Sequence, residues 1–249
     1  IMLNNIICIA NNELRRFFKS SLAWIILAIT QFFVAIFFYV PLVIYLQPAS
    51  VASGLTDAVV ATMYGFSAYI ILVISPLLTM RLIAEERQLG TLRLLFSSPL
   101  SITEIVLGKF FGIIALYLII LLMITLMPLS LLFGTQLDLG QISSILVGFS
   151  LLVASIASIG LFLSSLTNSP TVAAISTYGV LLFLMLIKIG GTNSSSEIAM
   201  VFSYLAIDKH YNNFLAGLFN SADIFYYVIL TIFFLILCIW RLDAERTYG

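Results

Sequence analysis

The stretch AEERQLGTLRLLFSSPLSITEIVLGK, residues 84–109, separates two long apolar runs and decides how the chain is organised. Of the chain, 62% is hydrophobic and only 9% is charged, whereas a soluble domain carries about 25% charged residues. The window 81–109 nevertheless contains Arg81, Glu85, Glu86, Arg87, Arg93, Glu104 and Lys109. A chain this poor in charge needs lipid as its main solvent. We therefore expect an all-α integral membrane protein with a polar hairpin at 84–103.

The order of residues in the window predicts three helical pieces. A span continues through Arg81–Leu89 and stops at Gly90, because glycine readily ends helices. Thr91 then caps a short helix, Leu92–Phe96, with an apolar face.

After Ser97-Ser98-Pro99 ends the short helix, Ser101 and Glu104 have the spacing of a capping box that opens the next span. A short helix held crosswise between two spans would pass force into both. A charged turn with no partner explains the same residues, and local geometry alone leaves both interpretations open.

Six segments have the length and apolar content of transmembrane helices, which need about 20 residues. They are 22–46, 64–83, 104–133, 142–166, 170–189 and 223–241, within a single transmembrane domain over 1–249. Pro41 and Pro48 are expected to end the first. The third is longer than one crossing needs, so we expect it to tilt or to kink near Pro128. Six spans place both chain ends on one side.

The distribution of Lys and Arg predicts which side this is, because cytoplasmic loops carry the excess. Nine fall on the face with the chain ends: Arg15, Arg16, Lys19, Arg81, Arg87, Arg93, Lys109, Arg241 and Arg246. Only Lys188 and Lys209 fall on the other face. We expect a multi-pass protein of the cytoplasmic (inner) membrane with both ends cytoplasmic.

Two flanking segments are expected outside the spans. In 1–21, Ile6, Ala10, Leu14, Phe17 and Phe18 recur at helical spacing, which predicts a helix in the membrane interface. In 190–222, a linker rich in Gly and Ser is followed by Tyr211, Phe214, Leu215 and Leu218 at the same spacing. We expect an external helix on or dipping into the outer leaflet.

The residues predict no catalysis on this chain. The span interiors contain no Asp, Glu, Lys, Arg or His, which disfavours an ion-coupled carrier. Cys8, Cys238 and His210 are too isolated for a metal site; we expect two buried thiols and an interfacial or hydrogen-bonding histidine. Gly108-Lys109 lacks the rest of a phosphate loop, and no basic stripe suggests nucleic acid. Energy for transport would come from another polypeptide.

The run Glu85-Glu86-Arg87-Gln-Leu-Gly90-Thr91-Leu92, followed by Ser98-Pro99-Leu100-Ser101 and Gly108-Lys109, resembles the signature of type-2 ABC exporter permeases. The order of segments is similar over essentially the whole chain. The resemblance implies that residues 85–87 and 90–93 couple the permease to a pair of ABC ATPase subunits that bind ATP and Mg²⁺. Many members carry an acidic residue where this chain has Arg93, which puts the contacts at that position in doubt.

The same resemblance implies a second permease copy or a related permease, surrounding lipid and a possible periplasmic accessory protein. His210, Tyr211, Phe214, Gly217 and Asp223 further resemble the gliding-motility and nitrous-oxide-reductase accessory branch, although Asn220 replaces a usual acidic residue. The expected function is that of an exporter permease. The alternative is a transport-inactive membrane scaffold for a motility or assembly machine.

Small residues spaced by four in the fourth span leave another question open. Ser150, Ala154 and Ser158, then Gly160 and Ser164, permit close helix approach in lipid. Such a stripe serves either packing within one subunit or a seam between two permeases.

Overall fold

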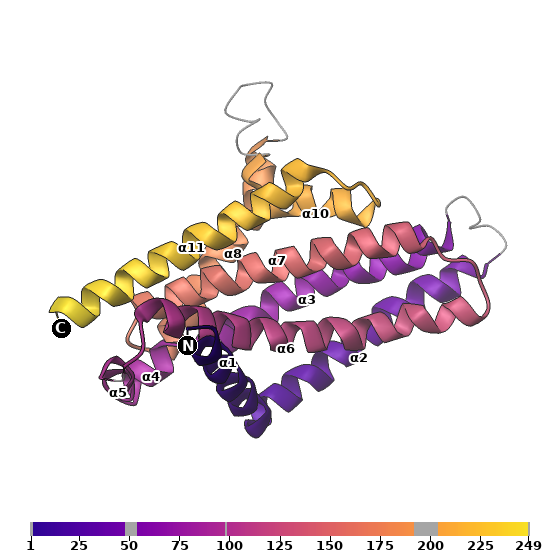
Figure 1. Cartoon of the computed structure of the whole chain (residues 1–249). Helices are drawn as coiled ribbons and strands as arrows, with labels where there is room; N and C mark the ends of the chain where they lie inside the picture. Colours follow the sequence, from indigo (N-terminus) through magenta and orange to yellow (C-terminus); the bar gives the residue numbers. More distant parts are fainter. Residues whose placement is uncertain (1, 48–53, 98, 192–203, 249) are drawn as a thin grey trace.

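The computed structural model describes residues 2–47, 54–97, 99–191 and 204–248, and this part of the chain is helical and without strands (Figure 1). Six helical segments in it are long and apolar enough to cross a membrane, as expected. They are α2 (Ser21–Tyr45), the segment containing η1 (Thr56–Ala61) and α3 (Thr62–Thr79), α6 (Ile102–Ser130), α7 (Leu139–Leu166), α8 (Pro170–Gly191) and α11 (Ser221–Tyr248).

The bundle has two distinct ends. At one end lie both chain ends together with α4 (Ala84–Gln88) and α5 (Leu92–Phe96), and we call this the hairpin end (Figure 1). At the opposite end α10 (Ile207–Leu215) packs against the start of α7 and against α11. The expected helical hairpin between the second and third spans is therefore present.

Of the prolines singled out in the sequence, Pro41 has a clear outcome. Pro41 lies inside α2, which continues to Tyr45, so the prediction that it ends the first span was wrong. A proline removes one backbone hydrogen bond, and a transmembrane helix tolerates this loss when its neighbouring backbone groups remain satisfied. Pro48 lies outside the described residues. Pro128 falls in the last turn of α6, which tightens into the 3₁₀ turn η2 (Leu131–Phe133).

The helix α1 (Met2–Lys19) packs along α6. Its predicted stripe faces the bundle only in part: Phe17 is buried, whereas Ile6, Ala10, Leu14 and Phe18 are half-buried. Cys8 on this helix is exposed and Cys238 is buried, so the expectation of two buried thiols was wrong for Cys8.

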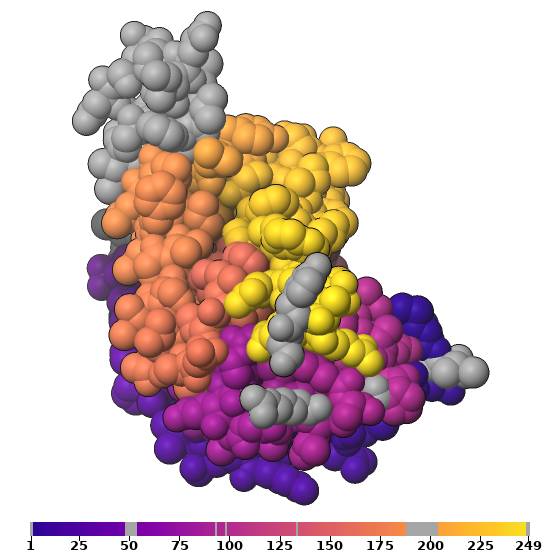
Figure 2. Space-filling view, turned by 90° about the vertical axis from the view of Figure 1, so that its left-hand side faces the viewer, coloured from indigo at the N-terminus to yellow at the C-terminus, as the bar shows by residue number. Residues whose placement is uncertain are grey.

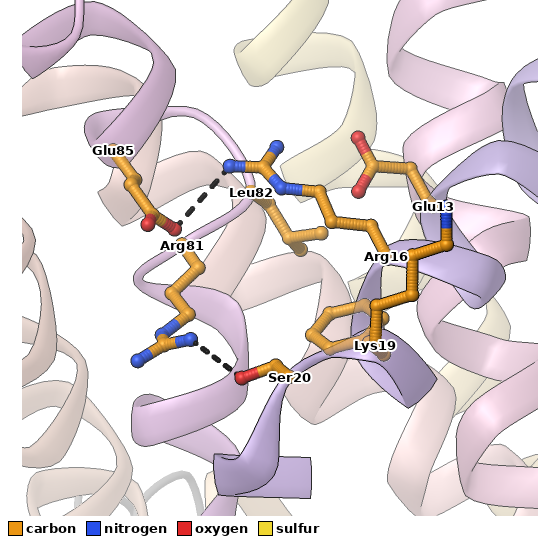
Figure 3. Close-up of a pocket in the computed structure, with 8 residues that line it drawn as sticks. Glu13, Arg16, Lys19, Ser20, Arg81, Leu82 and Glu85 are labelled. Atoms are coloured by element: carbon orange, nitrogen blue, oxygen red, sulfur yellow. Dashed lines mark hydrogen bonds and ion pairs between the residues drawn. The ribbon is translucent and has the colours of Figure 1, made fainter.

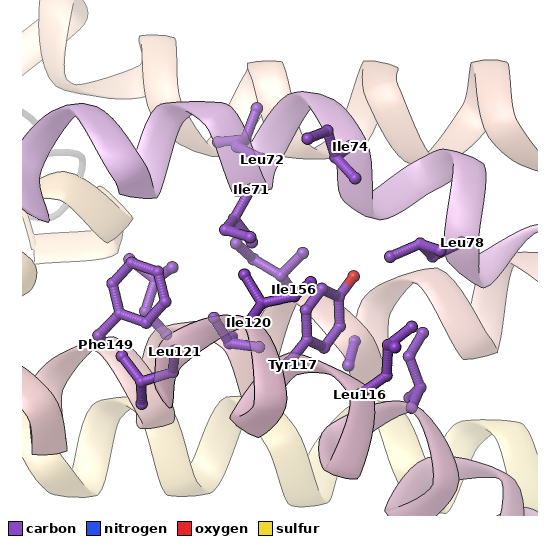
Figure 4. Close-up of a cluster of buried hydrophobic side chains, with 14 of the residues drawn as sticks. Ile71, Leu72, Ile74, Leu78, Leu116, Tyr117, Ile120, Leu121, Phe149 and Ile156 are labelled. Atoms are coloured by element: carbon purple, nitrogen blue, oxygen red, sulfur yellow. The ribbon is translucent and has the colours of Figure 1, made fainter. Parts of the chain in front are cut away.

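The core lies where α3, α6 and α7 meet (Figure 4). Ile71 and Leu78 of α3 face Leu116 and Ile120 of α6, while Ile156 of α7 closes the cluster. These side chains are almost fully covered, in contrast to the outer surfaces of α2 and α11. The exposed apolar side chains of those outer helices suit contact with lipid.

Small residues of α7 serve packing within the subunit. A Cβ placed on Gly160 would lie 2.3 Å from Thr79 Oγ1 of α3, so only glycine permits this approach. Ser158 and Ser164 are also buried in the bundle, whereas Ser150 and Ala154 are half-buried. The structure therefore places the second half of the stripe inside one subunit.

The segment before α11 differs from its predicted form. α8 continues to Gly191, so the first two residues of the expected linker are helical, and 192–203 lie outside the described residues. Tyr211 and Phe214 of α10 are buried and Leu215 is half-buried. Leu218 is 59% exposed because Gly217, at φ +76°, turns the chain away after the helix ends. The apolar stripe thus ends before Leu218, and its buried members face protein.

Candidate functional site

The hairpin turns sharply between its two short helices. Gly90 has φ +73°, a conformation that glycine adopts at little cost, and it separates α4 from α5. The Thr91 hydroxyl donates to the Glu86 carbonyl oxygen at 3.2 Å, while the Thr91 carbonyl oxygen accepts from the amides of Leu94 and Leu95. Thr91 therefore ties the two helices together, and α5 has the predicted bounds.

α4 is not a continuation of α3. The chain turns at 80–83, so the prediction of one unbroken helix through Leu89 was wrong. Ser164 of α7 explains the break: its Oγ accepts from the amides of Ile83 and Ala84 at 3.2 and 3.0 Å and donates to the Met80 carbonyl oxygen at 3.1 Å. One hydroxyl thus satisfies three backbone groups at the turn.

The inner face of the hairpin carries a buried charge cluster. Lys109 of α6 places its Nζ 2.5 Å from Glu13 of α1 and 2.7 Å from Glu86 of α4. Lys109 is only 2% exposed, and burying a charge is tolerated when it is paired. Three helices distant in sequence therefore meet at one ammonium group.

Arg16 of α1 adds a second link to α4. Its guanidinium lies 3.1 Å from Glu86 and 3.4 Å from Glu85. This pair is more open to solvent than the Lys109 cluster, since 42% of the Arg16 side chain is exposed. It therefore stabilises the hairpin less.

Arg87 joins the hairpin to the last helix. Its guanidinium contacts both carboxylate oxygens of Glu245 in α11, a two-point geometry that fixes orientation. It also donates to the Thr167 carbonyl oxygen at 2.6 Å, just beyond α7. Arg87 therefore bonds α4 to α11 and to the C-terminal end of α7.

Hydrogen bonds also hold the C-terminal end of the hairpin, where α6 begins. Ser101 and Glu104 form the expected capping box at the start of α6, with Ser101 N donating to Glu104 at 2.8 Å. Asn5 of α1 donates to the other Glu104 oxygen at 3.0 Å, and Arg246 of α11 donates to the Leu100 carbonyl oxygen at 3.1 Å.

The outer face of the hairpin is apolar and open. Leu89 and Leu94 are 65% and 72% exposed, whereas Leu92 is 4% exposed and packs into the core. In Figure 2 the surface of the hairpin, in magenta, lies beside the yellow end of α11. Arg93 belongs to α5, but its side chain lies outside what the structure describes.

The family model described as ABC-2 family transporter protein matches residues 7–246. The chain belongs to the ABC-2 transporter family. It is thus a multi-pass membrane protein and the membrane component of an ABC transporter. A search of curated proteins found no match.

In this ABC-2 family chain, the residues predicted for coupling divide into two sets. Glu85, Glu86, Arg87 and Leu92 face the bundle, whereas Gly90 and Thr91 lie at the exposed turn. Sequence reasoning missed Glu13 and Glu245, treated Ser164 only as a small packing residue, and assigned Lys109 no ion-pair partner. The signal for Glu13 was an acidic residue beside the apolar stripe of an otherwise basic helix.

The opposite end of the ABC-2 bundle holds a second polar cluster. His210 of α10 has Nδ1 2.5 Å from Asp223 and Nε2 2.8 Å from the Tyr204 carbonyl oxygen. Asn213 donates to the other Asp223 oxygen at 2.8 Å. The expectation of a hydrogen-bonding histidine was correct.

Rings surround this cluster and anchor α10. Tyr226 stacks on His210 with ring centroids 4.1 Å apart. Tyr211 donates to the Tyr64 carbonyl oxygen at 3.1 Å, and burial, with a smaller contribution from Tyr64, raises the pKa of Tyr211 well above its usual value. Its hydroxyl therefore stays protonated and remains a donor.

Proposed function

We propose that this chain is the permease subunit of an ATP-driven exporter. A separate ABC ATPase, which holds ATP and Mg²⁺, docks on the outer face of the α4–α5 hairpin. A second permease, identical or related, completes the transport path, and two ATPase subunits serve the pair. The family membership supports the permease role, and the hairpin supports the docking site.

The observation that carries the proposal is the difference between the two faces of the hairpin. Its outer face exposes most of the side chains of Leu89 and Leu94 as an anchor pair for a partner. Its inner face is bonded to α1, α6, α7 and α11 through Glu86, Arg87 and the amides that reach Ser164. A partner that displaces the hairpin therefore moves four helices.

The orientation follows from charge. Arg15, Arg16, Lys19 and Arg81 lie near the hairpin end, as do Arg87, Lys109, Arg241 and Arg246, whereas Lys209 lies at the α10 end. This bias supports a cytoplasmic hairpin end, because Lys and Arg accumulate on the cytoplasmic side. The hairpin is then on the side where ATP is available.

The test is purification in mild detergent from the native host, with mass spectrometry of co-purifying proteins and an assay of ATP hydrolysis. A Leu89→Asp/Leu94→Asp variant should lose the ABC ATPase that accompanies the wild type. The matched control is Leu139→Asp/Leu218→Asp, which changes two equally exposed leucines at the opposite end. It should retain the ATPase.

Two results would count against docking on this face. The outer-face variant would keep its ATPase, or the well-folded wild type would bring none. The second result would favour the transport-inactive scaffold. A Glu86→Gln variant, whose change is on the inner face, should keep the ATPase bound but lower substrate-stimulated ATP hydrolysis.

A further inference from the structure

A polar cleft lies where α1 ends, α2 begins and α3 turns into α4 (Figure 3). Its volume is about 270 Å³, and its polar lining comes from Glu13, Arg16, Lys19, Ser20, Arg81 and Glu85. This volume is just below the usual range for small-molecule pockets, roughly 300–1,000 Å³. The cleft therefore suits a compact polar group.

Both acidic residues of the cleft already have a cationic partner. Glu13 is paired with Lys109, and Glu85 with Arg16, as the upper dashed line in Figure 3 shows. Lys19 and Arg81, by contrast, have no carboxylate within ion-pair distance in the described part of the chain. The cleft thus presents two cations that form no ion pair.

The remaining groups at the cleft are hydrogen-bond donors. Ser20 Oγ accepts from the Leu22 amide at 3.3 Å and from Arg81 at 3.1 Å, which leaves its O–H proton available (Figure 3). The Arg81 guanidinium has five N–H donors, and that bond uses one of them. A ligand with several acceptor oxygens and negative charge matches this arrangement.

The level of the cleft relative to the apolar spans indicates where such a ligand comes from. Ser20 caps α2, and the apolar span begins immediately after it. Trp24, one turn further, is 59% exposed and donates its indole N–H to the Phe18 carbonyl oxygen at 2.9 Å. Exposed tryptophan with a polar tip is typical of the membrane–water interface. The cleft therefore opens at the level of lipid headgroups.

We propose that this cleft binds the phosphate of an anionic phospholipid headgroup through Lys19, Arg81 and Ser20. The lipid would bridge the α1–α2 junction and the turn before α4. The site is separate from the outer face of the hairpin, so it does not depend on ATPase docking.

Native mass spectrometry of the detergent-purified protein, titrated with phosphatidylglycerol or phosphatidylcholine, tests the proposal. The wild type should retain phosphatidylglycerol in preference to phosphatidylcholine. A Lys19→Gln/Arg81→Gln variant should bind phosphatidylglycerol about thirtyfold more weakly, since each basic residue near an anionic membrane surface contributes on the order of 1 kcal/mol. Arg15→Gln/Arg241→Gln removes the same charge from exposed positions outside the cleft and should bind like the wild type.

Lys19→Gln alone keeps the test valid if the double variant fails to fold, because Lys19 is exposed. It should weaken phosphatidylglycerol binding about fivefold. Equal weakening by the cleft and control variants would overturn the proposal. Displacement of the lipid by millimolar inorganic phosphate would overturn the lipid source and assign the cleft to a soluble anion.

Discussion

The hairpin is attached to the bundle mainly by charged groups, whereas α10 at the opposite end is attached mainly by buried rings. The single residue Lys109 links three helices, α1, α4 and α6, and Arg87 links α4 to α11. α10 instead inserts Phe214 against α7 and stacks His210 on Tyr226. The stabilisation from a hydrogen-bonded ion pair requires both partners in the right geometry. The stabilisation from ring packing depends on the apolar area that is covered. The hairpin is therefore held by a few specific pairs, and α10 by the apolar area that its rings cover.

The largest loss of stability should come from a change in the buried charge cluster around Lys109. Lys109→Met leaves Glu13 buried without its cation and removes one of the two cations that pair with Glu86, which should lower the free energy of unfolding by about 3–5 kcal/mol. Thermal unfolding in detergent would measure it. Arg241→Met, at an exposed position, should change little.

A triple variant, Lys109→Met/Glu13→Gln/Glu86→Gln, tests whether the loss comes from unpaired charge. It should recover much of the stability lost in Lys109→Met. If it does not, shape rather than charge holds the hairpin, and the contrast between the ends disappears.

The next effect should come from the polar cluster at the α10 end. Asp223→Ala removes the acceptor of Asn213 and the partner of His210, which should cost about 1–3 kcal/mol. Unfolding in detergent, compared with Asp57→Ala at an exposed position, would measure it. A loss as large as that of Lys109→Met would show that both ends depend equally on charge.

Ring packing is tested at Gly148 of α7. An added Cβ would lie 2.5 Å from Phe214 Cβ, so Gly148→Ala should push α10 away and cost about 1–2 kcal/mol. Amide hydrogen exchange should increase over 207–215. Gly65→Ala, whose Cβ would lie 3.6 Å from Leu215, should leave exchange there unchanged.

The smallest effect should come from Arg16. Because its ion pairs with Glu85 and Glu86 are partly exposed, Arg16→Gln should lower stability by less than about 1 kcal/mol. Arg15→Gln provides the baseline in the same unfolding measurement. A loss comparable to Lys109→Met would mean that burial does not decide which charges hold the hairpin.

The spans, the short helix Leu92–Phe96 and the capping box at Ser101 were predictable because apolar length, turn residues and capping side chains act locally. The partners of the hairpin were not. Glu13 and Lys109 are 96 residues apart, and Arg87 and Glu245 are 158 apart, so no local pattern connects them. The break before α4 depends on Ser164, which is 80 residues from Ala84 in the sequence.

Ser164 also joins the hairpin to a helix that reaches the opposite end of the molecule. Because its hydroxyl bonds to backbone groups at the turn between α3 and α4, α4 is attached directly to α7. α7 contains no proline and continues without interruption to Gln141, whose amide donates to the Leu215 carbonyl oxygen of α10 at 2.8 Å. The distance between Ser164 and Gln141 is about 35 Å at 1.5 Å per residue. α7 thus connects the hairpin to α10, through the Ser164 hydroxyl at one end and the Gln141 side-chain amide at the other.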